Sequence, residues 1–247
     1  MSKNTYSLVI PAYNEEKYIG DCLEYALRQK DFSEIIVIDN ASTDGTKKLV
    51  EKIAKEHPHA LGRLRVVTEM KKGLTRARER GRLEARGNVI AYVDADTRMP
   101  EKWLGMVIHE FEKNKNLAVL SGPYVYHDIP RYEQHLITIL YWYILAMPIY
   151  WLVGYMTVGG NFAIRTSALE KMGGFDTSIE FYGEDTNIAR RASKYGKVKF
   201  MPSLYMYTSA RRFEGQGVWK TGLIYMTNFV TEVVFKKPVT KKYVDIR

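Results

Sequence analysis

The chain contains the run Asn88-Val89-Ile90-Ala91-Tyr92-Val93-Asp94-Ala95-Asp96, in which apolar residues stop at two aspartates. An apolar run of this length predicts a buried strand of a parallel sheet. Open α/β folds bind ligands outside the carboxyl ends of such strands, so we expect both aspartates at the binding edge. Carboxylates placed there can share one Mg²⁺ or Mn²⁺ ion, which usually also takes substrate phosphate oxygens. The alternative is a solvated turn, where Asp is also common.

Strand and helix patterns alternate before this run. Strands are predicted over 6–10, 34–38, 64–68 and 88–93, and helices over 16–29, from the capping residues 42–44 through Glu56, and over 74–85. In the first helix, Ile19, Leu23 and Leu27 are spaced for one buried face. Alternation at this spacing predicts an α/β fold, with a mostly parallel sheet, right-handed crossovers and helices on both faces.

The composition is that of a globular protein with excess positive charge. The chain has 247 residues, 46% of them hydrophobic, and a formal net charge of +9. The length suits one large domain, and the charge favours nucleic acid, an acidic membrane surface or a phosphorylated substrate as partner. Cys22 is the single cysteine, so we expect a buried thiol in a reducing compartment. Because no basic-then-apolar leader precedes the first strand, we expect a cytoplasmic location.

Acidic and amide residues follow three of the predicted strands. They are Asn14-Glu15, Asp39-Asn40 and Asp94-Ala95-Asp96, and the sequence contains neither G-x-G-x-x-G nor a P-loop motif. The dinucleotide-binding and P-loop interpretations therefore lose their main support. Carboxylates at strand ends can bind the ribose hydroxyls and base N–H groups of a nucleotide while a metal ion takes its phosphates. Each acid alone is more often a helix cap, but three at one sheet edge favour a nucleotide site.

Four ordered motifs resemble glycosyltransferase family 2, which has the GT-A nucleotide-diphospho-sugar fold. They are residues 9–15, 36–46, 87–96 and 183–185, and the resemblance covers residues 5–213. It implies a GT-A catalytic domain over 1–213, with a nucleotide-binding half (1–96) and an acceptor half (97–213). It also implies sugar transfer from a nucleotide donor, usually with inversion, and a divalent cation, Mn²⁺ or Mg²⁺, on the D-x-D motif.

The resemblance assigns donor-binding roles to residues after the first two strands. Pro11, Tyr13 and Glu15 would line the nucleoside pocket, and Asp39 would bind the base. Arg211-Arg212-Phe213 lies where related enzymes carry a Q-x-x-R-W element that touches the diphosphate and the acceptor. Here the Gln is missing and Phe replaces Trp, so an ordinary solvated arginine pair is the alternative.

The resemblance also assigns the metal ligands and the base. Asp96 would be the principal metal ligand, and Asp94 would contact the metal or the ribose. Asp185, preceded by Glu184, matches the family's general base. A sugar hydroxyl is a poor nucleophile, and a carboxylate within hydrogen-bond reach can take its proton. The alternative for this acidic pair is a capped helix start.

Residues 71–86 are strongly basic. The basic side chains are Lys71, Lys72, Arg76, Arg78, Arg80, Arg82 and Arg86. A solvated helix face is the ordinary explanation. Lys72 and Arg76 open a helix that flanks the donor in the family, so they are candidates for contacting the diphosphate. The others suit lipid headgroups better than DNA, because no nucleic-acid module or interleaved aromatic pattern is present.

Residues 135–164 contain no Asp, Glu, Lys or Arg. The part from Leu136 to Val158 has the length of a transmembrane helix, and its Trp and Tyr residues suit a membrane interface. A single crossing would separate Asp96 from Asp185, which must meet in one site. We therefore expect a segment that lies in the interface, re-enters or is buried in protein, with a break at Pro148. A core helix pair or a dimer contact is the alternative.

Residues 214–247 are expected to form an amphipathic, basic C-terminal segment. Its helical stripe is Trp219, Leu223, Met226, Val230 and Val233, followed by Lys236, Lys237, Lys241 and Lys242. An apolar stripe with a basic end suits an anionic leaflet, although the helix could equally pack on the catalytic domain.

These features predict an inverting, metal-dependent glycosyltransferase that lies peripherally on the cytoplasmic face of a membrane. It would move a sugar from a UDP-linked donor to a hydroxyl of a lipid or lipid-linked glycan. One alternative is a polyprenyl-phosphate sugar synthase, whose acceptor is already ionised and has little need of Asp185. Another is a non-catalytic nucleotide-sugar-binding subunit, which would have no need of Asp94, Asp96 and Asp185.

Overall fold

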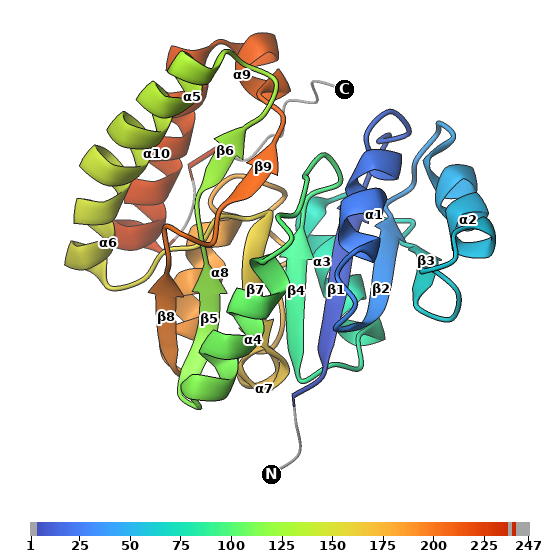
Figure 1. Cartoon of the computed structure of the whole chain (residues 1–247). Coiled ribbons are helices and arrows are strands. Elements are labelled where there is room, and N and C mark those ends of the chain that lie inside the picture. Colours follow the sequence, from blue (N-terminus) through green and yellow to red (C-terminus); the bar gives the residue numbers. More distant parts are fainter. Residues whose placement is uncertain (1–3, 237–238, 241–247) are drawn as a thin grey trace.

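The computed structural model describes residues 4–236 and 239–240 (Figure 1). Its strands are β1 (Tyr6–Ala12), β2 (Phe32–Asp39), β3 (Leu64–Thr68), β4 (Val89–Val93), β5 (Leu117–Ser121), β6 (Tyr124–Tyr126), β7 (Asn161–Arg165), β8 (Lys197–Phe200) and β9 (Met206–Thr208). Its helices are α1 (Ile19–Leu27), α2 (Thr46–Glu56), α3 (Leu74–Glu84), α4 (Trp103–Lys113), α5 (Arg131–Ile137), the π-helix η1 (Thr138–Ala146), α6 (Met147–Val153), α7 (Thr166–Lys171), α8 (Glu184–Ala192), α9 (Arg211–Gln216) and α10 (Val218–Phe235).

Within the described residues, seven strands form one sheet in the order β3-β2-β1-β4-β7-β5-β8. The strands β1 to β4 pair in parallel, and so do β5 and β8. The predicted mostly parallel α/β sheet is therefore confirmed. The prediction did not include β7, which lies antiparallel between β4 and β5. β6 and β9 pair in parallel as a separate two-stranded sheet.

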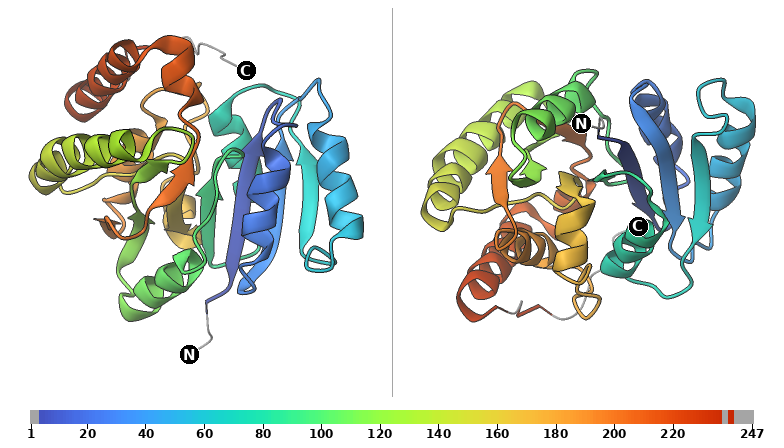
Figure 2. Two further views of the ribbon diagram at one scale, coloured as in Figure 1. Left: turned by 45° about the horizontal axis from the view of Figure 1, so that its top comes forward. Right: turned by 90° about the horizontal axis from the view of Figure 1, so that it is seen from below.

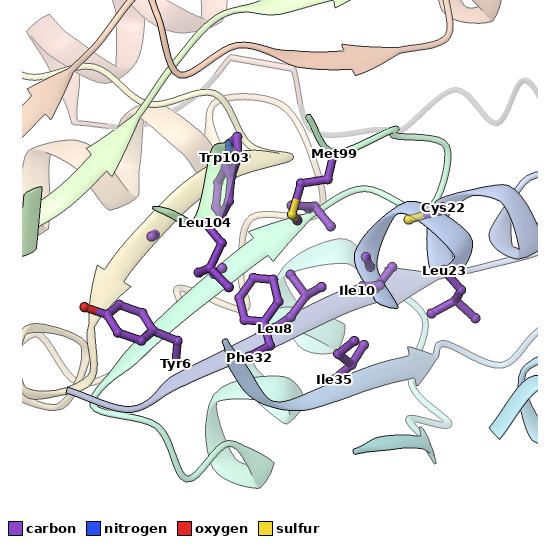
Figure 3. Close-up of a cluster of buried hydrophobic side chains, with 14 of the residues drawn as sticks. Tyr6, Leu8, Ile10, Cys22, Leu23, Phe32, Ile35, Met99, Trp103 and Leu104 are labelled. Atoms are coloured by element: carbon purple, nitrogen blue, oxygen red, sulfur yellow. The ribbon is translucent and has the colours of Figure 1, made fainter. Parts of the chain in front are cut away.

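Both faces of the sheet are covered by helices, which explains why its central strands are mostly apolar. On one face, α1, α2 and α4 enclose a core that includes Leu8, Ile35 and Trp103 (Figure 3). On the other face, α3, α7 and α8 pack against Val9 and Tyr92. Neighbouring residues of a strand point to opposite faces, so Leu8 and Val9 enter different cores.

One continuous helix, formed by α5, η1 and α6 over Arg131–Val153, begins just before the charge-free segment and occupies its first part. The predicted break at Pro148 is wrong. Pro148 lies in the first turn of α6, and just before it Met147 N–H donates to Trp142 O in the wider π-type turn. Such a turn accommodates the missing proline N–H without ending the helix. The helix ends at Gly154, whose φ of 81° is in the left-handed region, and the segment then returns to the core as β7.

This helix, called here the apolar helix, packs on the domain by a narrow stripe. Trp142 and Ala146 are buried against Phe200, and Trp142 Nε1–H donates to Tyr124 O at 2.9 Å. Most of its other large apolar side chains are exposed: Leu136, Ile139, Leu140, Tyr141, Tyr143, Ile144, Leu145, Trp151 and Leu152. By length and composition it is the one helix among the described residues that could cross a membrane.

The helix α10 lies with the apolar helix at the end of the molecule away from β3, in every view (Figures 1 and 2). Its buried Glu232 accepts hydrogen bonds from Arg190 and Asn187 of α8. Val230 and Phe235 of the same helix are exposed. The predicted side chains Trp219, Leu223 and Met226, and Lys237, Lys241 and Lys242, lie outside the described residues.

Candidate active site

Carboxylates gather at the carboxyl edge of the sheet, as the strand ends predict. Asp94 and Asp96 follow β4, Asp39 ends β2, and Glu15 lies in the loop after β1. Ala12, the last residue of β1, pairs with Asp39, so the ends of β1 and β2 are level. Because β4 runs parallel to β1, its aspartates reach the same edge. Three of these four acidic side chains, Glu15, Asp94 and Asp96, are paired with an arginine.

Arg211 supplies the cation for two of them. Its Nη2 atom lies 2.7 Å from Glu15 Oε1 and 2.8 Å from Asp96 Oδ2, and its guanidinium lies 4.4 Å from the centre of the Tyr18 ring. We call Arg211, Glu15 and Asp96 the outer cluster. Arg211, the first residue of α9, therefore links this helix to the ends of β1 and β4, although it is 196 positions from Glu15 in the chain.

Arg78 of α3 supplies the cation for Asp94. Its side chain is 1% exposed, contacts Glu184 Oε1 through Nη1, and lies 3.4 Å from Asp94 Oδ1 through Nη2. We call Arg78, Asp94 and Glu184 the inner cluster. The assignment of Arg78 to a solvated or headgroup-binding face is thus wrong. Arg80 and Arg82, on the same helix, pair with Glu84 and Glu79.

Two adjacent glycines let the inner cluster close. A Cβ atom on Gly160 would lie 2.2 Å from Asp94 Oδ2, and one on Gly159 would lie 2.4 Å from Glu184 Oε1. Any larger residue would push the carboxylates away. Tyr124 adds a third contact, because its hydroxyl donates to Asp94 Oδ2 at 2.9 Å. Burial and then the charge of Asp94 raise the pKa of Tyr124 well above its usual value, so the hydroxyl stays a donor.

Glu184 and Asp185 form the start of α8, as expected for the acidic pair. Glu184 is buried, and its burial raises its pKa to about 7 against the opposing charge of Arg78. Burial also raises the pKa of Asp185. Asp185 Oδ1 accepts the Thr186 N–H at 2.8 Å, and its carbonyl accepts the Thr157 hydroxyl at 2.6 Å. The carboxylate of Asp185 is thereby oriented, while Glu184 points back to Arg78.

The remaining predicted donor residues lie on the same side. Pro11 is buried near the end of β1, opposite Ile38 of β2. The Lys72 ammonium lies 4.2 Å from the centre of the Tyr13 ring and contacts its hydroxyl. Asp39 is buried, and within the described part of the chain its Oδ1 has no hydrogen-bond partner. An oxygen in this state favours a ligand N–H, since leaving it unmet costs free energy.

Arg76 and Arg212 are also predicted to bind the donor or acceptor, and both are half-buried. Arg76 is half-buried in the first turn of α3, with its side chain beside Gly73. Arg212 is half-buried on α9, with its guanidinium 4.5 Å from the centre of the Phe181 ring. Arg76 thus lies two positions before Arg78 on α3, and Arg212 directly follows Arg211 on α9.

The aspartates Asp94 and Asp96 fit a partial metal site. No group of three His, Cys, Asp or Glu side chains in the described residues is arranged to hold a metal ion. Two carboxylates one residue apart would therefore need further oxygens from substrate or water. That donor set suits Mg²⁺ or Mn²⁺, which commonly use one or two carboxylates together with substrate phosphates. The two residues can hold such an ion when a diphosphate completes its coordination.

Sequence comparison assigns the family. The family model described as "Glycosyl transferase family 2" matches residues 7–173. The chain belongs to glycosyl transferase family 2. The probable glycosyltransferase YdaM of Bacillus subtilis is 30% identical over 207 residues, which is 80% of this chain and 49% of that protein. The chain spans half or less of the length of the first curated relatives it matches.

Solved structures of low identity share the fold with this family 2 chain. The mannosyltransferase PcManGT from Pyrobaculum calidifontis, in complex with GDP-Man and Mn²⁺, gives a TM-score of 0.71 at 19% identity, covering 96% of this chain and 64% of that one. TarS 1–349 of S. aureus, in complex with UDP-GlcNAc, gives 0.66 at 19% identity, covering 96% and 68%. The predicted GT-A architecture is confirmed by these matches.

Arg78 and Tyr124 are the residues that sequence reasoning missed. The available signal for Arg78 is its position on α3: Ala77 and Gly81 are small, and with Leu74 they repeat at helical spacing. Such spacing marks the face that packs closely on the sheet, and Arg78 lies on it. An arginine there needs carboxylate partners, which two distant motifs provide.

Proposed function

We propose that this protein is a metal-dependent, inverting glycosyltransferase that moves a sugar from a nucleotide-sugar to a hydroxyl group of a lipid or lipid-linked glycan. The observation that carries the proposal is the inner cluster. Arg78 contacts both Asp94 of the D-x-D motif and Glu184, the neighbour of Asp185. A candidate metal site and a candidate base are therefore fixed to one buried side chain.

The donor would lie along the carboxyl edge of the sheet. Asp39 Oδ1 is available to accept a base N–H, and Lys72 beside Tyr13 offers positive charge to the diphosphate. Uracil and guanine both carry an N–H that suits a carboxylate, and we propose a UDP-linked sugar as the donor. TarS with UDP-GlcNAc and PcManGT with GDP-Man and Mn²⁺ support a nucleotide-sugar and a divalent ion. When bound, Mn²⁺ or Mg²⁺ would neutralise charge on the departing diphosphate.

Asp185 would act as the general base. The acceptor hydroxyl oxygen forms a bond to the anomeric carbon from the face opposite the diphosphate, its proton passes to the Asp185 carboxylate, and the carbon–oxygen bond to the diphosphate breaks. The electron pair leaves with the diphosphate, so the configuration inverts. A carboxylate whose pKa is raised by burial is a stronger base than an exposed one, while the Thr186 N–H at the N-terminus of α8 favours its ionised form.

The exposed apolar side chains of the apolar helix and α10 support contact with a membrane, and we propose that the protein lies on its cytoplasmic face. The apolar helix and α10 lie at one end of the molecule and expose Trp151, Leu152 and Phe235. Because Trp142 and Ala146 pack on the domain, the apolar helix runs along the protein instead of leaving it. A helix held in this way can enter the headgroup zone with its exposed side chains and keep the site on one side of the bilayer.

A donor screen tests the catalytic part of the proposal. Release of nucleoside diphosphate would be measured for UDP- and GDP-linked sugars with Mn²⁺, with a chelator, and in Asp96→Ala. We expect release from a UDP-sugar that is lost with chelator and falls by about 10³ in Asp96→Ala, the scale for removing an electrostatic stabiliser. Equal release with chelator, or none from any donor, would contradict the proposal. Release from GDP-sugars alone would mean that the donor carries guanine and that the proposed UDP-linked donor is wrong.

A liposome test addresses the membrane. Wild type and a Trp151→Ser, Leu152→Ser double variant would be sedimented with vesicles of anionic and neutral lipid, at low and high salt. Both residues are exposed, so the variant should fold. We expect the variant to bind about tenfold more weakly at high salt, where charge attraction is screened and apolar insertion remains. Trp142 is unsuitable for this test because it is buried on Phe200. A wild type that stays in the supernatant at low salt would defeat the membrane assignment.

A further inference from the structure

Arg211 lies where a metal ion would have to approach Asp96. Its Nη2 atom contacts Asp96 Oδ2 and Glu15 Oε1 at 2.8 and 2.7 Å. The stack on Tyr18 fixes the plane of the guanidinium. Glu15 is buried, and the Asp96 side chain is only 12% exposed. The ion pair is therefore well defined and largely shielded from water.

A metal ion alone would meet two obstacles at this carboxylate. It must displace the guanidinium from Asp96 Oδ2, and it must then lie next to a positive charge that Glu15 still holds in place. Repulsion between cations at such separations is strong at a partly buried site. A nucleoside diphosphate removes both obstacles, because its oxygens offer the guanidinium a new bidentate partner and offset the added positive charge.

We propose that Arg211 makes metal binding at Asp96 depend on the nucleoside diphosphate. Without nucleotide it neutralises Asp96, and when the diphosphate enters, the guanidinium moves to the phosphate oxygens while the metal ion takes the carboxylate. Arg211 is thus a selectivity residue for a metal–diphosphate pair over the metal alone. This inference rests on the proposed metal-dependent function and extends it to the order in which the partners can bind.

The chain offers a matched control in Arg98. It lies two positions after Asp96 and carries the same charge, but its Nε atom pairs with Asp21 Oδ2 at 2.5 Å. Arg98→Gln therefore removes one positive charge near the site without breaking a contact to Asp96. A general electrostatic effect would appear in both variants, and a direct one only in Arg211→Gln.

The experiment measures free Mn²⁺ by electron paramagnetic resonance during titration of the full chain. Wild type, Arg211→Gln, Arg211→Lys and Arg98→Gln would each be titrated without nucleotide, with UDP and with GDP. Thermal unfolding followed by circular dichroism shows that each variant is folded. Arg211→Lys keeps the charge but loses the planar guanidinium that stacks on Tyr18, so it reports on the site even where the glutamine variant is poorly folded.

We expect Arg211→Gln to bind Mn²⁺ alone at least about tenfold more tightly than wild type, and Arg98→Gln to change by less than about threefold. The increase in Mn²⁺ affinity caused by nucleotide should be smaller in Arg211→Gln than in wild type, and intermediate in Arg211→Lys. If Arg211→Gln and Arg98→Gln behave alike while wild type binds Mn²⁺ with nucleotide, this inference is wrong and the proposed function stands. If no form binds Mn²⁺ with either nucleotide, the proposed metal dependence fails, and the inference with it.

Discussion

The inner and outer clusters each place one arginine between two carboxylates, but their arginines differ in burial. Each uses one arginine to join an aspartate of the D-x-D motif to a glutamate: Arg78 joins Asp94 to Glu184, and Arg211 joins Asp96 to Glu15. Arg78 is 1% exposed and comes from the face of α3 that packs on the sheet. Arg211 is 20% exposed and comes from α9, beyond the last strand.

This difference in burial separates a fixed contact from an exchangeable one. Arg78 and Glu184 are 1% and 6% exposed, and breaking so buried an ion pair leaves an uncompensated charge, which is costly, so the Arg78–Glu184 contact must stay closed in every state. Asp94 is 36% exposed and can meet a ligand while this contact holds. Arg211 is 20% exposed, so phosphate oxygens of a ligand can reach its guanidinium and replace a carboxylate as its partner. The inner cluster should therefore govern folding and the position of the base, and the outer cluster should govern ligand binding.

The largest expected effect is on stability, from breaking the inner cluster. Arg78→Met keeps the length of the side chain but leaves Asp94 and Glu184 without their shared cation, which should cost about 3–5 kcal/mol. Arg80→Met, on the same helix, removes a surface pair with Glu84 whose side chains are 41% and 28% exposed, and should cost less than about 1 kcal/mol. Urea unfolding of both variants measures the difference. Equal losses of unfolding free energy in the two variants would mean that the burial of Arg78 does not make its ion pairs more important for stability than those of Arg80.

The next effect is on turnover. Asp185 follows Glu184 in α8, so it belongs with the inner cluster, and its loss should leave donor binding nearly unchanged. Asp185→Asn should lower turnover with a hydroxyl acceptor by about 10² or more, the usual scale for a general base. Asp176→Asn, which changes a residue that binds Ser178 in a loop, is the control. Wild-type turnover in Asp185→Asn would favour an already ionised phosphate acceptor instead.

The contrast between the clusters also shows which parts of the fold and the site can be predicted from the sequence. The strand predicted over 64–68 matches β3 residue for residue, and Asp94 and Asp96 reach the predicted edge, because alternation and strand-end position are local properties. The burial of Arg78 depends on Asp94 and Glu184, which come from other parts of the chain. The pairing of Arg211 likewise depends on partners that are distant in sequence. Hydropathy also could not distinguish buried Trp142 from exposed Trp151, since the packing of one on Phe200 is a tertiary contact.

A pH series tests the charge state of the inner cluster. The pKa of Glu184 is raised to about 7 by burial, so the folded state holds a proton that the unfolded state has released above pH 4.5. Stability therefore falls as pH rises towards 7, since the folded state binds more protons. Between about pH 5.5 and 7.5, wild type should lose about 2 kcal/mol more than Glu184→Gln, which has no such proton. Parallel pH profiles of unfolding free energy for the two proteins would contradict this account.

The smallest effect separates the clusters most directly, through heat stability with Mn²⁺ and no nucleotide. In Arg211→Gln the carboxylates of Asp96 and Glu15 have lost the guanidinium of Arg211, and Mn²⁺ can take its place. A tenfold gain in affinity for the folded state adds about 1.4 kcal/mol at saturation, which raises Tm by about 3–6 °C for a chain of this size. In Arg78→Lys the outer cluster is intact, so Mn²⁺ alone should raise Tm no more than in wild type. An equal gain in both variants would mean that Mn²⁺ responds to the overall loss of favourable charge pairing, and that Arg211 has no special hold on Asp96.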